Sequence, residues 1–164
     1  VKIYDYNRVV KDLNGLSEAE LLEKIGAAFN VVEQEEAAKP EARNSFGMYI
    51  AGKWYALSIK DPAPEQGSPV DKLDISILTA RLLEPILGTG DPRVDPRIDF
   101  IGGIRGMAEL EKRVNSGDWA VAFALFATSM DDLMSVADAE EVMPPKSTWF
   151  EPKLADGMVS LVLE

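Results

Sequence analysis

Residues 91–106 read DPRVDPRIDFIGGIRG, and this stretch combines the signals for a stiff loop, a strand and a helix start. A doubled Asp-Pro-Arg phrase comes first, and its prolines fix the backbone torsion φ. The apolar residues that follow predict a short strand over Ile98–Ile101. A glycine turn, Gly102–Gly106, then leads into a helix predicted over Met107–Val114. A strand that enters a helix through a tight turn favours a fold with both kinds of element.

The remainder of the chain continues this alternation of strands and helices. The apolar run Trp119–Phe126 is predicted to be the central strand, buried on both faces. Phe46–Ile50 and Trp54–Ile59 flank a short loop with a glycine, which predicts a β-hairpin. The other expected elements are strands at Val1–Val10, Ser147–Phe150 and Met158–Leu163, helices at Ser17–Phe29, Asp71–Leu87 and Ser129–Ala139, and exposed connections at Glu33–Arg43 and Asp61–Pro69. We therefore predict one α+β domain over residues 1–164, with a mixed β-sheet, a hairpin and about four helices.

The charge of the chain restricts its partners. Seventeen basic residues stand against 28 acidic ones, which gives a net charge of −11. Binding to duplex DNA draws its strength from cations that neutralise phosphates, and anionic lipid attracts the same groups. Duplex DNA and membranes are therefore disfavoured as partners of this segment. No apolar run approaches the length of a membrane span.

The absence of cysteine and histidine restricts the chemistry. Without cysteine there are no disulfides, thiolate nucleophiles or zinc–thiolate sites, which fits a reducing, cytoplasmic location. Without histidine the chain lacks the commonest metal ligand and the commonest general base near neutral pH. We assign no catalytic residue and expect no cofactor bound by this segment alone.

The glycine turn Gly102–Gly106 is the first candidate site. A turn between a strand end and a helix start exposes backbone N–H groups beside the positive helix end, which suits phosphate or carboxylate. Arg105 would add a bidentate contact. The alternative is a structural turn whose Arg105 pairs with a neighbouring acid such as Asp99. A lesser candidate group, more typical of turn chemistry, consists of Lys11, Asp12 and Asn14.

The acids Asp91, Asp95 and Asp99 recur every four residues and suggest a site for a hard cation such as Mg²⁺. However, arginines alternate with them, and the prolines prevent a regular helix that would gather all three on one face. We therefore favour a rigid, salt-linked loop in which aspartates cap turns. No metal site is assigned.

A second candidate region lies near the end of the sequence. Residues Lys146–Lys153 contain two lysines, two hydroxyls, two aromatic rings and a carboxylate, which suits the wall of a pocket for a phosphorylated ligand. The alternative is a strand whose Trp149 and Phe150 pack on opposite faces. The complete set of candidate anion-binding residues is Gly102, Gly103, Arg105, Gly106, Arg97, Lys146 and Lys153.

Several segments resemble an uncharacterised prokaryotic family, known as a domain of unknown function and often labelled SpoOJ/ParA/ParB/RepB. These segments are Arg8–Leu16, Leu83–Gly88, Gly90–Arg93, Arg97–Gly106 and Met143–Lys153. The resemblance implies that the chain is the C-terminal portion of a longer protein. It also implies an upstream domain with an Asp-Gly-His-His-Arg phrase, similar to ParB-like folds that handle phosphates.

Three hypotheses about function follow. In the first, the chain completes a phosphate- or nucleotide-binding pocket together with the upstream domain, and the intact protein is of phosphotransferase type. In the second, it is a non-catalytic interaction or dimerisation module, which makes a homo-oligomer. In the third, the ParB label implies chromosome partition on DNA, and the net charge of −11 argues against that role for this segment.

Overall fold

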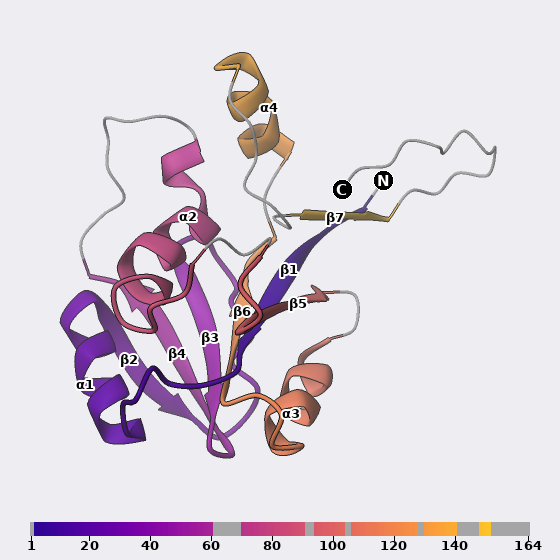
Figure 1. The fold of residues 1–164 in the computed structure, drawn as a ribbon. Helices are drawn as coiled ribbons and strands as arrows, with labels where there is room; N and C mark the ends of the chain where they lie inside the picture. Colours follow the sequence, from indigo (N-terminus) through magenta and orange to yellow (C-terminus); the bar gives the residue numbers. More distant parts are fainter. Residues whose placement is uncertain are drawn as a thin grey trace.

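The computed structural model describes residues 2–60, 70–90, 94–103, 106–127, 130–140 and 148–151 (Figure 1). Its strands are β1 (Lys2–Val10), β2 (Phe29–Gln34), β3 (Ser45–Ile50), β4 (Lys53–Ile59), β5 (Ile98–Gly102), β6 (Val121–Leu125) and β7 (Thr148–Glu151). Its helices are α1 (Glu18–Ala28), α2 (Asp74–Leu78), α3 (Met107–Asn115) and α4 (Met130–Asp138), with a 3-10 turn η1 (Val70–Lys72) and a π-helical segment η2 (Thr79–Leu83). No helix within these ranges is both long and apolar enough to cross a bilayer.

The strands form one sheet in the order β2-β4-β3-β6-β1-β5, and β7 pairs with the first half of β1. The α+β class, the hairpin and the helices are confirmed. Every described pair of neighbouring strands is antiparallel, however, where a mixed sheet was predicted. The reason is that β5 and β6, which α3 connects, run in the same direction but have β1 between them. The crossover therefore joins parallel strands that are not neighbours.

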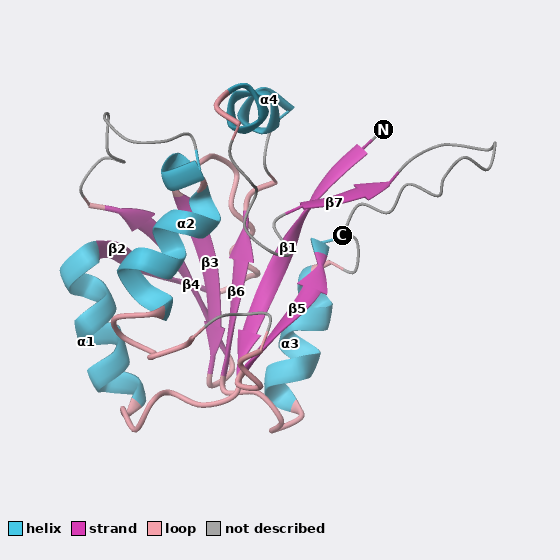
Figure 2. Ribbon diagram, turned by 45° about the horizontal axis from the view of Figure 1, so that its top comes forward, coloured by secondary structure: helices cyan, strands magenta, loops and turns pink. Residues whose placement is uncertain are grey.

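The sheet separates two cores, as the alternating side chains of β6 show. Val121, Phe123 and Leu125 belong to the core that α1, α2 and η2 cover, whereas Ala122 and Ala124 belong to the core under α3. Figure 2 shows α1 and α2 side by side near β2 and β4, and α3 next to β5. All five residues of β6 are buried, so the predicted central strand is confirmed.

The predicted helix start at Ser17 and the predicted hairpin are confirmed in atomic detail. The hydroxyl of Ser17 accepts a hydrogen bond from the Glu20 N–H at 3.1 Å, and the Glu20 carboxylate accepts one from the Ser17 N–H at 2.9 Å. This capping box starts α1. In the hairpin, Ala51 and Gly52 both have positive φ, 50° and 80°, which is typical of the type I′ turns that join antiparallel strands.

The segment Glu33–Arg43 was predicted to be an exposed connection, but its first two residues belong to β2. This strand lies at the edge of the sheet and pairs only with β4 among the described strands. Further along the same connection, the carbonyl of Ala38 lies over Gly47 of β3, where a side chain would collide with it. The predicted strand Met158–Leu163 lies outside the described residues.

The predicted helix Asp71–Leu87 is present but changes its winding along its length. After α2, the Glu84 N–H bonds to the Thr79 carbonyl at 3.0 Å, five residues back. Pro85 has no N–H to continue the regular ladder, which accounts for the wider turn. Gly88, at a φ of 67°, then ends the helix, and the Thr89 N–H bonds to the Leu83 carbonyl at 3.0 Å.

Candidate functional site

A cavity of about 320 Å³ lies between the α2–η2 helix, the turn after it and the strands β1 and β5. Its volume falls at the lower end of the range for small-molecule sites, roughly 300–1,000 Å³. The residues that line it are Arg8, Ile75, Ser76, Thr79, Ala80, Leu83, Glu84, Thr89, Gly90 and Ile98. The wall is mainly apolar with a few polar groups, which is the usual composition of a ligand pocket.

Arg8 is the most unusual of these residues because it is only 2% exposed. Arginine is almost never buried this completely unless its charge is compensated. Its Nη1 donates a hydrogen bond to the Tyr6 carbonyl at 2.5 Å, and its guanidinium carbon lies 4.8 Å from the centre of the Phe100 ring. Arg8 pairs directly with Phe100 across β1 and β5, so the register of the sheet places the cation over that ring.

Three hydroxyl groups lie on residues around the same cavity. Ser76 comes from α2, Thr79 begins the π-helical segment, and Thr89, which is 6% exposed, follows the glycine that ends the helix. Glu84 also lines the cavity, but it is exposed to solvent. A buried cation, hydroxyl donors and one exposed carboxylate therefore share one concave surface, and such a surface is able to hold an anionic group.

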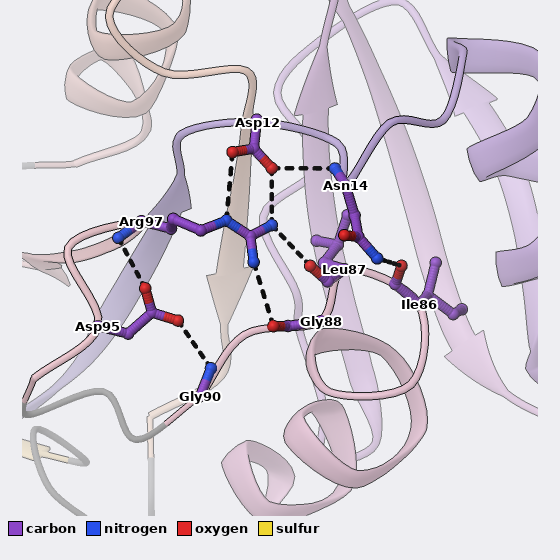
Figure 3. A network of polar contacts seen from close by, with 8 residues as sticks. All are labelled: Asp12, Asn14, Ile86, Leu87, Gly88, Gly90, Asp95 and Arg97. Carbon is purple, nitrogen blue, oxygen red and sulfur yellow. Dashed lines mark hydrogen bonds and ion pairs between the residues drawn. The ribbon is translucent and has the colours of Figure 1, made fainter.

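The turn after the helix is held in place by Arg97 (Figure 3). Its guanidinium binds both carboxylate oxygens of Asp12, at 2.6 and 3.2 Å, and donates to the carbonyls of Leu87 and Gly88 at 2.7 and 3.1 Å. The hydrogen bond to Arg97, followed by one from the Asn14 N–H, holds the pKa of Asp12 below its ordinary value. The same ion pair raises the pKa of Arg97.

Two further contacts fix the ends of that turn (Figure 3). The Asn14 side-chain amide donates to the Ile86 carbonyl at 3.2 Å, and one carboxylate oxygen of Asp95 accepts from the Gly90 N–H at 2.7 Å. The other Asp95 oxygen accepts from the Arg97 N–H at 2.9 Å, and these two bonds lower the pKa of Asp95. We call Asp12, Asn14, Asp95 and Arg97 the turn clamp.

The predicted candidates fall into separate places. Gly102 ends β5, Gly103 accepts a hydrogen bond from the Gly106 N–H at 3.0 Å, and Gly106 precedes α3 with a φ of 79°. Arg97 lies before the other end of β5, five residues or about 17 Å away at roughly 3.4 Å per residue. The described candidates therefore do not form one site, and none of them lines the cavity. Arg105, Lys146 and Lys153 lie outside the described residues.

The acids of the doubled Asp-Pro-Arg phrase also have local partners. Asp95 belongs to the turn clamp, and Asp99 lies 3.6 Å from Arg113 of α3. Asp91 lies outside the described residues. Within the described ranges, no three acidic side chains gather as they would around a metal ion. The preferred interpretation of a salt-linked loop fits the contacts of Asp95 and Arg97.

Sequence reasoning missed the cavity, although one signal for it was present. Arg8 stands two residues before Val10 in a strand whose residue spacing places both side chains on the same face. Val10 is fully buried, so Arg8 places a charged side chain on the face of the strand that turns toward the core, where an apolar residue is expected. Thr79 and Thr89 gave no such signal, because hydroxyl residues are common at any helix surface.

Comparison with known proteins supports the relation to an uncharacterised family. Residues 1–76 match the model of a family described as a protein of unknown function, DUF1015. That description contains no reference to ParB or SpoOJ. No curated protein matches the chain.

Several solved structures are similar to this chain, and two of them reach a TM-score of 0.50. Two are variants of a free serine kinase in complex with AMP, with TM-scores of 0.50 and identities of 18% and 19%. A conserved hypothetical protein from Pyrococcus furiosus has a TM-score of 0.49 and 15% identity. Each match covers 90% of this chain, but this chain spans only about half of those structures, 53% of the two kinase chains and 55% of the other. At these identities the likeness shows the fold alone.

Proposed function

We propose that this chain forms part of a protein that binds a nucleotide or another phosphate ester in the cavity beside Arg8. The burial of Arg8 in the wall of that cavity is the observation that carries the proposal. A guanidinium presents several N–H donors in a fixed plane that matches phosphate oxygens. In surroundings with little water, such hydrogen bonds are stronger than at the surface.

Two observations support this assignment. The hydroxyls of Thr79 and Thr89 lie on residues of the same lining and supply neutral donors for further phosphate oxygens. The fold is also that of free serine kinase structures that are in complex with AMP. The likeness supports a phosphate-bearing ligand without assigning any residue to it.

We propose further that the cavity is one part of a larger site. This chain spans about half the length of the similar kinase structures, 53%. A second part of the protein would then close the ligand from the other side, as expected for an upstream ParB-like domain that handles phosphates. In that arrangement the intact protein is of phosphotransferase type, and this chain supplies the arginine.

Isothermal titration of the full-length protein with AMP, ADP and phosphoserine tests the proposal. We expect binding to the wild type, a loss of at least about tenfold in Arg8→Lys, and a smaller loss in Thr79→Val, which removes one hydroxyl at constant shape. Lys24→Met is the control, since it removes one positive charge from the exposed side of α1.

Two outcomes would overturn the proposal. One is a wild-type protein that binds none of the three ligands. The other is unchanged affinity in Arg8→Lys with an unchanged melting temperature. If Arg8→Lys does not fold, Thr79→Val decides, and an affinity equal to that of the wild type then counts against the site.

A further inference from the structure

We infer that the ligand of the Arg8 cavity carries an ammonium group in addition to its anionic group. This inference rests on the proposed function and narrows the class of ligand. The ligand would be a small zwitterion, in which a phosphate ester or a carboxylate lies against Arg8 and a primary ammonium lies against Glu84.

The charges of the cavity are arranged from floor to mouth. Among the described residues that line it, only Arg8 and Glu84 carry a charge. Arg8 lies on β1 and is 2% exposed, so its cation belongs to the floor. Glu84 follows the last residue of η2 and is exposed, so its carboxylate belongs to the mouth. Glu84 also forms no ion pair with any residue in the part of the chain that the structure describes.

This arrangement favours a ligand with opposite charges at its two ends. The two charged side chains of the lining cancel, so a ligand with a net negative charge would meet the carboxylate of Glu84 on its way in. Each additional phosphate would add repulsion at the mouth. An ammonium at the outer end of the ligand turns the same interaction into an attraction. A compact amine-bearing anion therefore complements the cavity better than a polyphosphate.

Glu84 becomes a determinant of specificity in this proposal. Because it is exposed, its attraction for an ammonium is that of a surface ion pair, roughly 1 kcal/mol at most. That value corresponds to a preference of about fivefold, since roughly 1.4 kcal/mol is tenfold in affinity. Arg8, in contrast, contributes to the binding of every anionic ligand and does not select among them.

Paired ligands that differ only in the amine test the inference. Phosphoethanolamine and ethyl phosphate are titrated into the full-length protein. β-Alanine and propionate form a second pair, in which a carboxylate replaces the phosphate as the anionic group. We expect phosphoethanolamine to bind about five times more tightly than ethyl phosphate. Glu84→Gln should reduce this ratio to about one, and Glu23→Gln, an exposed carboxylate of α1, should leave it unchanged.

The outcomes separate this inference from the proposed function. Equal affinities for the amine-bearing and amine-free ligands of both pairs in the wild type would refute the zwitterion while leaving a phosphate or carboxylate site in place. A preference that persists in Glu84→Gln would refute the role of Glu84. If the wild type binds none of the four ligands but binds AMP or ADP, the zwitterion inference fails and the proposed function stands. If it binds neither these four ligands nor AMP, ADP or phosphoserine, the cavity is not an anion site and both ideas fail.

Discussion

Asp74, the first residue of α2, is the titratable group whose environment gives the clearest prediction of pH dependence. Burial raises its pKa from 3.8 to about 6, and the nearby Asp132 adds a smaller upward effect. A hydrogen bond of 2.8 Å from the Asn44 N–H and the charge of Arg43 act in the opposite direction. The carboxylate is therefore less stable in the folded protein than in the unfolded chain.

The sign of the effect on stability follows from the two pKa values. Between pH 3.8 and about 6, folded Asp74 still holds a proton that the unfolded chain has released. Folding is then coupled to proton uptake, so stability falls as the pH rises through this window. Above about pH 6 the folded protein bears the full free-energy cost of holding Asp74 ionised in its buried position. Two pKa units correspond to about 3 kcal/mol, and partial exposure of the side chain to water lowers this to roughly 1–2 kcal/mol.

Asp74→Asn removes the charge and keeps an oxygen that accepts from the Asn44 N–H. A negative charge in the first turn of a helix is itself favourable by about 0.3–1 kcal/mol, which the variant loses. We expect a net gain of about 1 kcal/mol at pH 8, or roughly 2–4 °C in melting temperature for a chain of this size. At pH 4 the gain should vanish, because folded Asp74 is then protonated.

Thermal unfolding of wild type and variant in parallel, in steps from pH 4 to pH 8, measures this difference. Subtracting the two curves cancels the titration of the carboxylates that do not interact with Asp74. Asp118→Asn is the control, since it removes a carboxylate from an exposed turn after α3. A difference that is the same at pH 4 and pH 8, or a variant that is less stable at pH 8, would refute the reasoning.

Three further predictions concern stability. Arg97→Ala should cost about 2–3 kcal/mol because its charge-assisted bonds are lost, and hydrogen exchange should increase at residues 86–90 more than elsewhere. Gly47→Ala should destabilise the protein strongly or prevent folding, since the added carbon would lie 2.0 Å from the Ala38 carbonyl oxygen. Gly26→Ala, in α1 with nothing within 4 Å of the added carbon, should instead stabilise the protein by roughly 0.5–1 kcal/mol. Equal effects of the two substitutions on stability would contradict the packing around Gly47. Ser17→Ala should cost about 1 kcal/mol in urea unfolding through loss of the capping box, and no change would contradict that cap.

The parts of the fold that the sequence predicted are those with a local cause. The helix start at Ser17 and the hairpin turn at Ala51 and Gly52 depend on residues within a few positions of each other. Strand β2 was missed because it is defined by its pairing, Val31 opposite Leu57 for example, 26 residues away. The prediction of a mixed sheet failed for a similar reason, since local patterns do not show which strand is inserted between two others.

The candidate site likewise has parts that local sequence predicts and parts that depend on residues far apart in the chain. The interpretation of Asp12 and Asn14 as turn residues and of the Asp-Pro-Arg phrase as a salt-linked loop was available from local chemistry, and the turn clamp agrees with it. The pairing of Asp12 with Arg97 could not be predicted from the sequence, because these two residues are 85 positions apart. The cavity was still harder to predict, since β1 supplies its cation, while a helix more than sixty residues later and the turn after that helix supply its hydroxyls.

The turn clamp and the cavity belong to one arrangement because they use two sides of the same turn. Arg97 and Asn14 bind the carbonyls of residues 86–88, and the next two residues, Thr89 and Gly90, line the cavity. A ligand that had to order this turn on binding would lose affinity to the entropy of ordering. The clamp performs that ordering when the chain folds, so the wall of the cavity is in place before any ligand arrives. Arg97 was predicted from the sequence to be a direct ligand of the anion. In the structure it instead holds in place the turn that forms one wall of the cavity, so its effect on binding is indirect.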